Sequence, residues 1–395
     1  MSTKRSSIDT MLIMLAMLAA VMPIFLAKPL VAVTLLFLTV RIIISKDLYY
    51  YIHQKIIITI LFIPGILGAV STSPEHLVRF SGIMIIVLGF PFLSFRIKQF
   101  PILVTSVLIL IYLCVSQILI LQENQLMIDF RDFGYRSEWS YAFDQYGHVE
   151  NIFREFIDFF KDDYIRAGGL YFNPNVQGVV ILLYFFIFSI SWKNYNQTIA
   201  HDKKKIIKLF IYLLMFSLMI FSIMLTKSRT VIISLLAYII FQNLNISDLI
   251  RFKLKKKLII PIFFTIIILS IFIENIMKGI FTQTGSANIK IVVIFDYLSQ
   301  ASIGDLLFGG KFDRNFDAEY GNWIATSGYL GVLAFFIFYK MVYRFAPQTK
   351  ALIISFLLIG IGNTLFYNLL YASILIPLFI ILLSFNIKDS ENNYK

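Results

Sequence analysis

Basic side chains in a very short connection between two apolar runs are the first feature that could do chemistry. Lys227 and Arg229 stand in L-T-K-S-R-T, residues 225–230. Placing a guanidinium at membrane depth costs about 2.5–3.5 kcal/mol on insertion scales, so an Arg retained there usually lines a cavity or meets an anion. Arg also binds phosphate through two hydrogen bonds at once. Arg229 is therefore a candidate phosphate ligand, the alternative being an interfacial anchor whose head group reaches water.

A further basic residue, Arg166, opens the motif R-A-G-G-L-Y-F-N-P-N, residues 166–175, just before another apolar run. Asn173 and Asn175 could contact a ligand, or could cap the following helix with the proline in its first turn. The glycines could let the backbone approach a ligand closely, or could simply form a turn. Capping explains the Asn and Pro residues but not Arg166, which is a second candidate for binding an anion.

Acidic, basic and aromatic residues gather ahead of a later apolar run. Asp317 or Glu319 could act as a general base beside the cation Arg314. The alternative is that these carboxylates interact only with the dipole of the helix that follows. Tyr320 and Trp323 could contact a ligand, although aromatic residues are common at membrane interfaces in any case.

Sequence signatures of metal and cofactor sites are absent. The chain has no HExxH, CxxC, GxSxG or GxGxxG motif, and its one cysteine, Cys114, lies inside an apolar run. A single cysteine supports neither a disulfide framework nor a Cys-based metal site, so its ordinary role is packing. We therefore expect neither a metal nor a cofactor.

Composition indicates that lipid surrounds most of the 395-residue chain. Hydrophobic residues make up 58% and charged residues 15%, with a mean hydropathy of +0.80. Soluble domains carry about 25% charged residues, so the apolar surplus must face something other than water. The net charge of +12 lies mainly in short loops between apolar runs, where it sets membrane orientation. A nucleic-acid partner is therefore not expected.

The apolar runs predict an all-α polytopic membrane protein with about twelve transmembrane helices in one integral domain, residues 1–395. The windows lie at 10–27, 29–45, 56–73, 77–95, 100–121, 176–192, 206–226, 230–244, 258–274, 322–340, 349–366 and 369–386. We expect the first window to be an uncleaved helix. A cytoplasmic N-terminus places most of the 35 basic residues and few of the 23 acidic ones in cytoplasmic loops, and it makes the C-terminus cytoplasmic too.

Two predicted outer loops, residues 122–175 and 275–321, are too long to be simple turns. Functional residues concentrate on such loops, and most of the candidates named above lie in them. In the first loop, apolar residues recur at helical spacing over about 148–162, with charged residues opposite. This pattern predicts an amphipathic helix that lies on the outer membrane surface or docks on the helical bundle.

Three motifs in this order resemble the Wzy-type O-antigen polymerase and O-antigen ligase superfamily. They are R-x-G-G-L-x-x-N-P-N from Arg166, the S-R-T connection at 228–230, and D-x-E-Y-x₇-G-x-x-G from Asp317; the resemblance covers roughly residues 160–340. Gly178 follows Arg166 by twelve positions, one more than in the Arg-x₁₀-Gly pattern of some polymerases. The superfamily consists of bacterial inner-membrane glycosyltransferases that act at the periplasmic side on sugars carried by undecaprenyl pyrophosphate. The resemblance thus implies two long periplasmic loops and an active site that needs no nucleotide or metal.

Carried over residue by residue, the resemblance makes Arg166 and Arg229 contacts for phosphate or sugar. It places Asp317 and Glu319 where ligases typically carry a histidine. The histidines of this chain all lie elsewhere, at His53, His76, His148 and His201. Their absence from this segment favours a polymerase over a ligase.

The expected function is O-antigen polymerase, an enzyme that joins lipid-linked oligosaccharide repeat units for lipopolysaccharide biosynthesis. Asp317 or Glu319 would take the proton of the attacking hydroxyl, and Arg229 would stabilise the departing pyrophosphate. The expected substrate-binding residues are Arg166, Asn173, Asn175, Lys227, Arg314, Tyr320 and Trp323, the last two by stacking on sugar rings.

The expected partners are undecaprenyl-pyrophosphate-linked oligosaccharides, the lipid bilayer, and a chain-length regulator of the polysaccharide co-polymerase type. Two alternatives share much of this description: an O-antigen ligase, and a flippase or other transporter of lipid-linked oligosaccharides. A transporter would be expected to have short outer loops and charges in mid-helix, whereas here the charges cluster in long outer loops.

Overall fold

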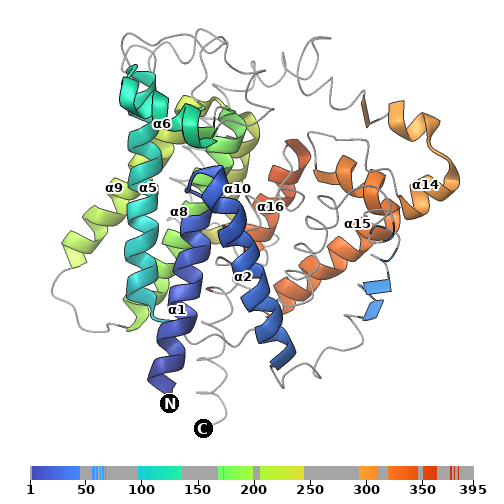
Figure 1. Cartoon of the computed structure of the whole chain (residues 1–395), viewed down its shortest axis with the longest axis horizontal. Helices are drawn as coiled ribbons and strands as arrows, with labels where there is room; N and C mark the ends of the chain where they lie inside the picture. Colours follow the sequence, from blue (N-terminus) through green and yellow to red (C-terminus); the bar gives the residue numbers. More distant parts are fainter. Residues whose placement is uncertain are drawn as a thin grey trace, which may run out of the picture. The chain divides into compact units, whose positions relative to one another are not determined.

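The computed structural model describes eight segments of the chain and a few isolated positions. They are residues 2–44, 97–135, 168–171, 173–198, 205–243, 296–309, 319–345 and 350–362, with single residues or pairs among 56–67, 293–294 and 374–381. All regular secondary structure in these segments is helical (Figure 1), as the all-α prediction requires. The chain divides into two compact units. Unit 1 comprises Met1–Ser45, Phe92–Ile232 and Leu369–Lys395, and unit 2 comprises Lys46–Pro91 and Ile233–Asn368.

Four of the described helices contain stretches long and apolar enough to cross a membrane. These stretches are Gln99–Leu121, Pro174–Asn196, Lys208–Thr226 and Tyr320–Lys340. They confirm the predicted windows at 100–121, 176–192, 206–226 and 322–340. The windows at 56–73, 77–95, 258–274 and 369–386 lie wholly or largely outside the described residues, as does the amphipathic helix expected at 148–162. Twelve spans and their orientation therefore stay predictions.

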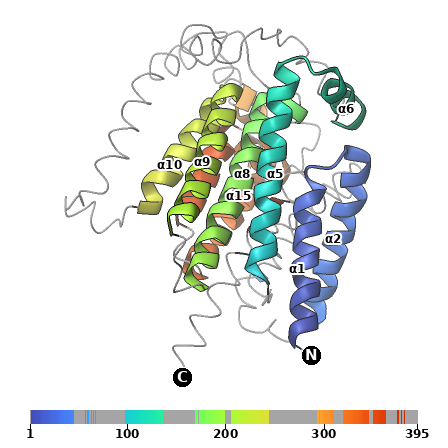
Figure 2. The same ribbon diagram turned by 90° about the vertical axis from the view of Figure 1, so that its left-hand side faces the viewer.

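Unit 1 is a bundle of apolar helices. Its helices are α1 (Ser2–Ala19), α2 (Ile24–Ile44), α5 (Gln99–Leu121), α8 (Pro174–Thr198), α9 (Lys205–Thr226) and the first turn of α10 (Arg229–Asn243). Helix α5 packs against α1, α8 and α9, and α8 also packs against α9. Figure 2 shows α5, α8 and α9 side by side, with α1 beside α2.

Helix α8 is the core of this bundle. Its ten consecutive residues from Val179 to Phe188 are each at most 1% exposed. A helix that is apolar on every side is normally buried on every side. Aromatic rings join α8 to α9: the centroids of Phe185 and Phe216 are 5.7 Å apart, as are those of Phe188 and Tyr212. Offset ring contacts of this kind add to the stabilisation from buried area.

The boundary predicted for the first span is wrong, because one window, 10–27, covers parts of two helices. Helix α1 ends at Ala19 and α2 begins at Ile24, immediately after Pro23. Proline has no N–H to donate within a helix and keeps the preceding residue out of helical conformation. Since the turn between the helices is itself mostly apolar, hydropathy alone did not reveal it.

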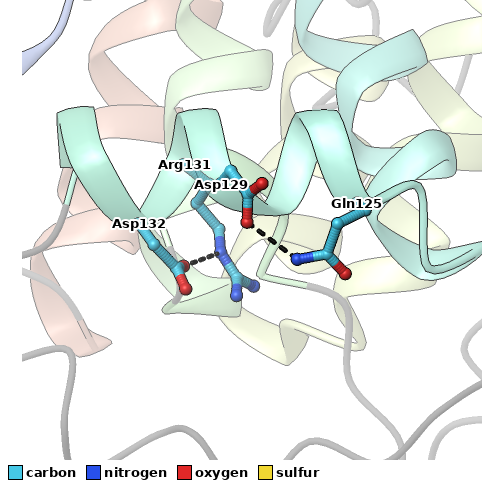
Figure 3. A network of polar contacts seen from close by, with 4 residues as sticks. All are labelled: Gln125, Asp129, Arg131 and Asp132. Carbon is cyan, nitrogen blue, oxygen red and sulfur yellow. Dashed lines mark hydrogen bonds and ion pairs between the residues drawn. The ribbon is translucent and has the colours of Figure 1, made fainter.

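A short helix, α6 (Gln125–Tyr135), follows α5 and lies across its end (Figures 1 and 2). The Asn124 side chain caps it, because its Oδ1 accepts a hydrogen bond from the Met127 N–H at 3.1 Å. Two polar contacts lie along the helix (Figure 3): Gln125 Nε2 to Asp129 Oδ1 at 2.7 Å, and Arg131 Nε to Asp132 Oδ1 at 3.0 Å. Helix α6 packs against α5, α2 and the short 3-10 helix η4 (Gly169–Tyr171). The sequence analysis did not predict it.

The described part of unit 2 contains α14 (Ile303–Phe308), α15 (Glu319–Phe345), α16 (Lys350–Gly362) and the remainder of α10. Helix α15 packs against both α14 and α16. The Tyr320 hydroxyl donates to the Leu357 carbonyl at 2.8 Å, and the Ser355 hydroxyl donates to the Ser234 carbonyl of α10 at 2.8 Å. These bonds hold α16 beside its neighbours.

Helix α15 is interrupted at Gly328, which has φ +63° and ψ −171°. The end of α14 fits into this interruption, backbone against backbone. A Cβ added to Gly328 would overlap the Leu307 carbonyl group and lie 2.5 Å from Phe308 N. A Cβ added to Gly309 would lie 2.6 Å from Gly328 N. Only glycine allows the two chains to approach this closely.

Candidate functional site

The N-P-N motif forms the start of α8. Pro174 is the first helical residue, and the Asn173 Oδ1 accepts a hydrogen bond from the Asn175 N–H at 2.9 Å. The Gln177 N–H then donates to the Asn173 carbonyl at 3.0 Å, which is the first bond of the helical ladder. Capping by Asn173 is thus confirmed. Its additional role as a substrate ligand, and that of Asn175, stay predictions.

The glycine before this helix permits a close approach to α8. Gly169 has φ +54°, and a Cβ there would lie 2.8 Å from the Gln177 Cδ. The Gln177 side chain is fully buried, and its Nε2 donates to the Leu113 carbonyl of α5 at 3.4 Å. The segment 169–171, the first turns of α8 and the last third of α5 are therefore packed together. Gly169 thus forms part of a short 3-10 turn packed on α8, which supports the turn interpretation; close approach to a ligand stays a prediction.

The S-R-T connection is a tight corner between α9 and α10. Lys227 adopts a left-handed backbone conformation, with φ +49°, and its N–H donates to the Met224 carbonyl at 3.0 Å. The Ser228 N–H donates to the Thr226 Oγ1 at 3.3 Å. Arg229 is the first residue of α10 and is partly exposed. The sequence prediction that residues 225–230 form a very short connection is confirmed.

The two motifs of unit 1 meet at Gly178. A Cβ on this glycine would lie 3.1 Å from the Thr226 Oγ1 and 3.2 Å from the Val231 Cγ2. Gly178 is three residues beyond Asn175, or about 4.5 Å along the helix axis at 1.5 Å per residue. The structure therefore brings the start of α8 against the corner that carries Lys227 and Arg229. Segments about fifty positions apart in sequence form one end of unit 1.

This end of unit 1 combines features that suit an anion. Two helices, α8 and α10, begin there, and helix N-termini carry a partial positive charge. Lys227 and Arg229 add two formal positive charges, both on partly exposed residues. A phosphate is the kind of group that such an arrangement can hold.

The second group of predicted residues belongs to unit 2. Glu319 is the first residue of α15, and Tyr320 follows it, with its hydroxyl bonded to α16. Trp323 is only 1% exposed, and its ring centroid lies 4.7 Å from that of Phe335. In this structure Trp323 is part of the unit 2 core, so sugar stacking by this residue stays a prediction. A small apolar pocket in unit 2 is lined by Tyr320, Trp323, Val332, Phe335, Phe336, Tyr339 and Leu357.

Three predicted site residues lie outside the described part of the chain. They are Arg166, Arg314 and Asp317. For Glu319 the structure describes the backbone only. Their roles stay predictions from the sequence.

Within the described residues, no group of three or more His, Cys, Asp or Glu side chains could hold a metal ion. Cys114 is a free, buried cysteine in α5, which confirms its interpretation as a packed side chain. That the protein needs no metal or other cofactor stays an expectation.

The sequence analysis missed two features, one in each unit. Two polar side chains, Gln177 just after the first motif and Ser228 within the S-R-T motif, are buried, and only the structure shows this. Helix α14 does have a local signal, because Ser302 and Asp305 form a capping box ahead of Leu306. The Ser302 Oγ accepts from the Asp305 N–H at 3.1 Å, and the spacing S-x-x-D could have been recognised.

Comparison of the chain with protein families, with curated protein sequences and with solved structures finds no match.

Proposed function

We propose that this protein is a membrane-embedded polysaccharide polymerase of the O-antigen type. Its substrates would be oligosaccharide repeat units carried on undecaprenyl pyrophosphate, used at the periplasmic side of a bacterial inner membrane. The observation that carries the proposal is the contact of Gly178 with Thr226 and Val231. This contact brings the helix that follows the first motif against the corner that carries Lys227 and Arg229, and thus links two of the three motifs on which the resemblance to Wzy-type polymerases rests.

The proposed reaction is a glycosyl transfer between two lipid-linked sugars. A hydroxyl of the incoming repeat unit attacks the anomeric carbon of the growing glycan, and a new glycosidic bond forms. The bond from that carbon to the pyrophosphate oxygen breaks, and its electron pair leaves with undecaprenyl pyrophosphate. Asp317 or Glu319 takes the hydroxyl proton.

The basic residues take the role that a divalent metal has in many pyrophosphate-releasing enzymes. Lys227 and Arg229, with Arg166 and Arg314, stabilise the negative charge that develops on the departing pyrophosphate. Arginine holds a phosphate through two donors and remains charged at any relevant pH. The proposal therefore includes neither a metal nor a nucleotide.

The setting of the reaction follows from its substrates. Both substrates are anchored in the bilayer, so they would approach the enzyme laterally through the membrane. All-helical structure and helices long enough to span a membrane support this setting. A chain-length regulator of the polysaccharide co-polymerase type would be the protein partner.

A lipopolysaccharide gel tests the pathway. Deletion of the gene in its source strain should leave a single repeat unit on the core and remove the ladder of longer chains, and complementation should restore the ladder. Bare core without any repeat unit would instead indicate an O-antigen ligase or a flippase. An unchanged ladder would refute the proposal.

A point variant tests the phosphate-binding role. Arg229→Ala should abolish chain extension while the protein still inserts into the membrane, as measured by membrane fractionation and immunoblotting. Lys208→Ala is the matched control, because it removes one positive charge near the opposite end of α9, where Lys208 lies over the Tyr195 ring at 5.5 Å. Polysaccharide chains of normal length from the Arg229→Ala variant would refute the phosphate-binding role of Arg229.

A further inference from the structure

The side chain of Ser228 sits at the start of α10 but does not cap it. The Ile232 N–H donates to the Ser228 carbonyl at 3.0 Å, so Ser228 occupies the N-cap position. An N-cap serine ordinarily accepts a hydrogen bond from an N–H two or three residues further on. Among the described residues, none hydrogen-bonds to the Ser228 Oγ, although the residue is only 1% exposed. A buried hydroxyl without a partner is unusual and calls for an explanation.

The corner itself fixes the backbone that carries this hydroxyl. The Thr226 hydroxyl donates to the Ile223 carbonyl at 2.7 Å and accepts from the Ser228 N–H at 3.3 Å. Lys227, between them, is held in the left-handed conformation. Thr226 in turn contacts the Gly178 position of α8. The backbone of Ser228, the residue directly before α10, is thus held on both sides without any capping bond from its own hydroxyl.

The surroundings of the hydroxyl select for an anion. Lys227 and Arg229 flank it directly, and the N-terminus of the fifteen-residue helix α10 contributes its partial positive charge. Both flanking residues are partly exposed, so the buried hydroxyl lies between two cationic residues that reach the surface. A serine O–H is a donor that a phosphate oxygen can accept.

We infer that Ser228 is a phosphate-binding residue, whose hydroxyl donates a hydrogen bond to a phosphate oxygen held at the N-terminus of α10 between Lys227 and Arg229. The inference rests on the proposed function, in which this corner receives the pyrophosphate, and it assigns a ligand role to the serine of the S-R-T motif, which the sequence analysis had not made a site candidate. In this inference, the partner that the Ser228 hydroxyl lacks among the described residues is an oxygen of the substrate.

Binding of inorganic pyrophosphate to the purified full-length protein in detergent tests this inference without any sugar substrate. Isothermal titration calorimetry would compare wild type with Ser228→Ala, at constant ionic strength. We expect binding to weaken about ten- to a hundredfold, the range for one hydrogen bond to a charged group. Ser228→Thr keeps a hydroxyl and should bind at least ten times more tightly than Ser228→Ala.

A stability measurement separates ligand binding from a structural role. Removing an unpaired buried hydroxyl should leave the ligand-free thermal midpoint unchanged or raise it. Ser106→Ala is the matched control, because Ser106 is also buried in unit 1 but its hydroxyl is bonded to the Leu103 carbonyl at 2.7 Å. A Ser228→Ala protein that fails to fold, or melts lower than wild type, would show that the hydroxyl holds the corner together and would overturn the inference.

A second probe, undecaprenyl pyrophosphate in the same detergent, distinguishes the source of the phosphate. Ser228-dependent binding of both probes indicates recognition of the phosphate alone, and binding of the lipid probe only indicates recognition of a lipid-linked phosphate. Equal binding by wild type and Ser228→Ala would overturn the inference, as would no binding of either probe. If pyrophosphate binding depends on Ser228 while gene deletion leaves the lipopolysaccharide ladder intact, the polymerase function is refuted and the phosphate-binding site is retained.

Discussion

Replacing Gly328 with alanine tests the interruption of α15 directly. Gly328 has φ +63° and ψ −171°, a backbone region that is essentially reserved for glycine. The added methyl group would also overlap the Leu307 carbonyl group, which belongs to α14. The substitution therefore strains the backbone and pushes α14 away at the same time.

The magnitude follows from these two effects. Holding a residue with a side chain in this backbone region costs about 1–3 kcal/mol. Inserting a methyl group into a fully packed contact costs a further amount of about 1–3 kcal/mol. Together they amount to about 2–6 kcal/mol, a large share of the roughly 5–15 kcal/mol that stabilises a typical folded protein.

Thermal unfolding of the purified protein in detergent measures this effect. Gly304→Ala is the matched control, because a Cβ at that position in α14 would meet only the Ser302 Oγ, at 3.7 Å. The control should unfold at the wild-type temperature or slightly above it, since alanine is favoured over glycine in a helix by up to about 1 kcal/mol. If Gly328→Ala unfolded at the same temperature as Gly304→Ala, the contact between α14 and the interruption would not exist as described.

Two further substitutions test the end of unit 1. Asn173→Ala removes the cap of α8 and should destabilise the protein by about 0.5–2 kcal/mol, measured by thermal unfolding; Asn173→Asp keeps the acceptor and should stay close to wild type, and equal loss in both variants would contradict the capping role. Gly178→Leu should separate α8 from the Thr226 corner, because even a Cβ would lie 3.1 Å from the Thr226 Oγ1. A membrane-inserted Gly178→Leu protein should give a shortened or absent ladder on the lipopolysaccharide gel, and a wild-type ladder would show that this contact is dispensable.

The long apolar helices could be predicted because length and composition alone define them. Helices α5, α9 and α10 begin and end within a few residues of their windows. Helix α6 could not be predicted this way, since it has only eleven residues and mixes polar and apolar side chains. The turn at Pro23 was missed for the opposite reason, because apolar residues continue through it.

The candidate site could be predicted only as separate motifs. The Asn173 cap is a local feature, and an Asn followed by Pro174 predicts it from the sequence alone. The contact of Gly178 with Thr226 is a tertiary contact, and no local sequence pattern predicts it. The interruption at Gly328 was expected as ordinary helix, because its cause is the approach of α14 rather than any property of the neighbouring residues.

The burial of α8 has a consequence for how the protein is made. In the most apolar stretch of α8, 78% of the residues are buried within the protein, whereas in that of α9 only 33% are buried. Helix α8 also buries Gln177, Ser189 and Ser191, which would meet acyl chains if the helix entered lipid alone. The order of the chain resolves this difficulty, since α5 is synthesised before α8 and the strongly apolar α9 soon after it. We therefore expect α8 to leave the insertion machinery together with these neighbours, which would cover its few polar side chains, rather than alone.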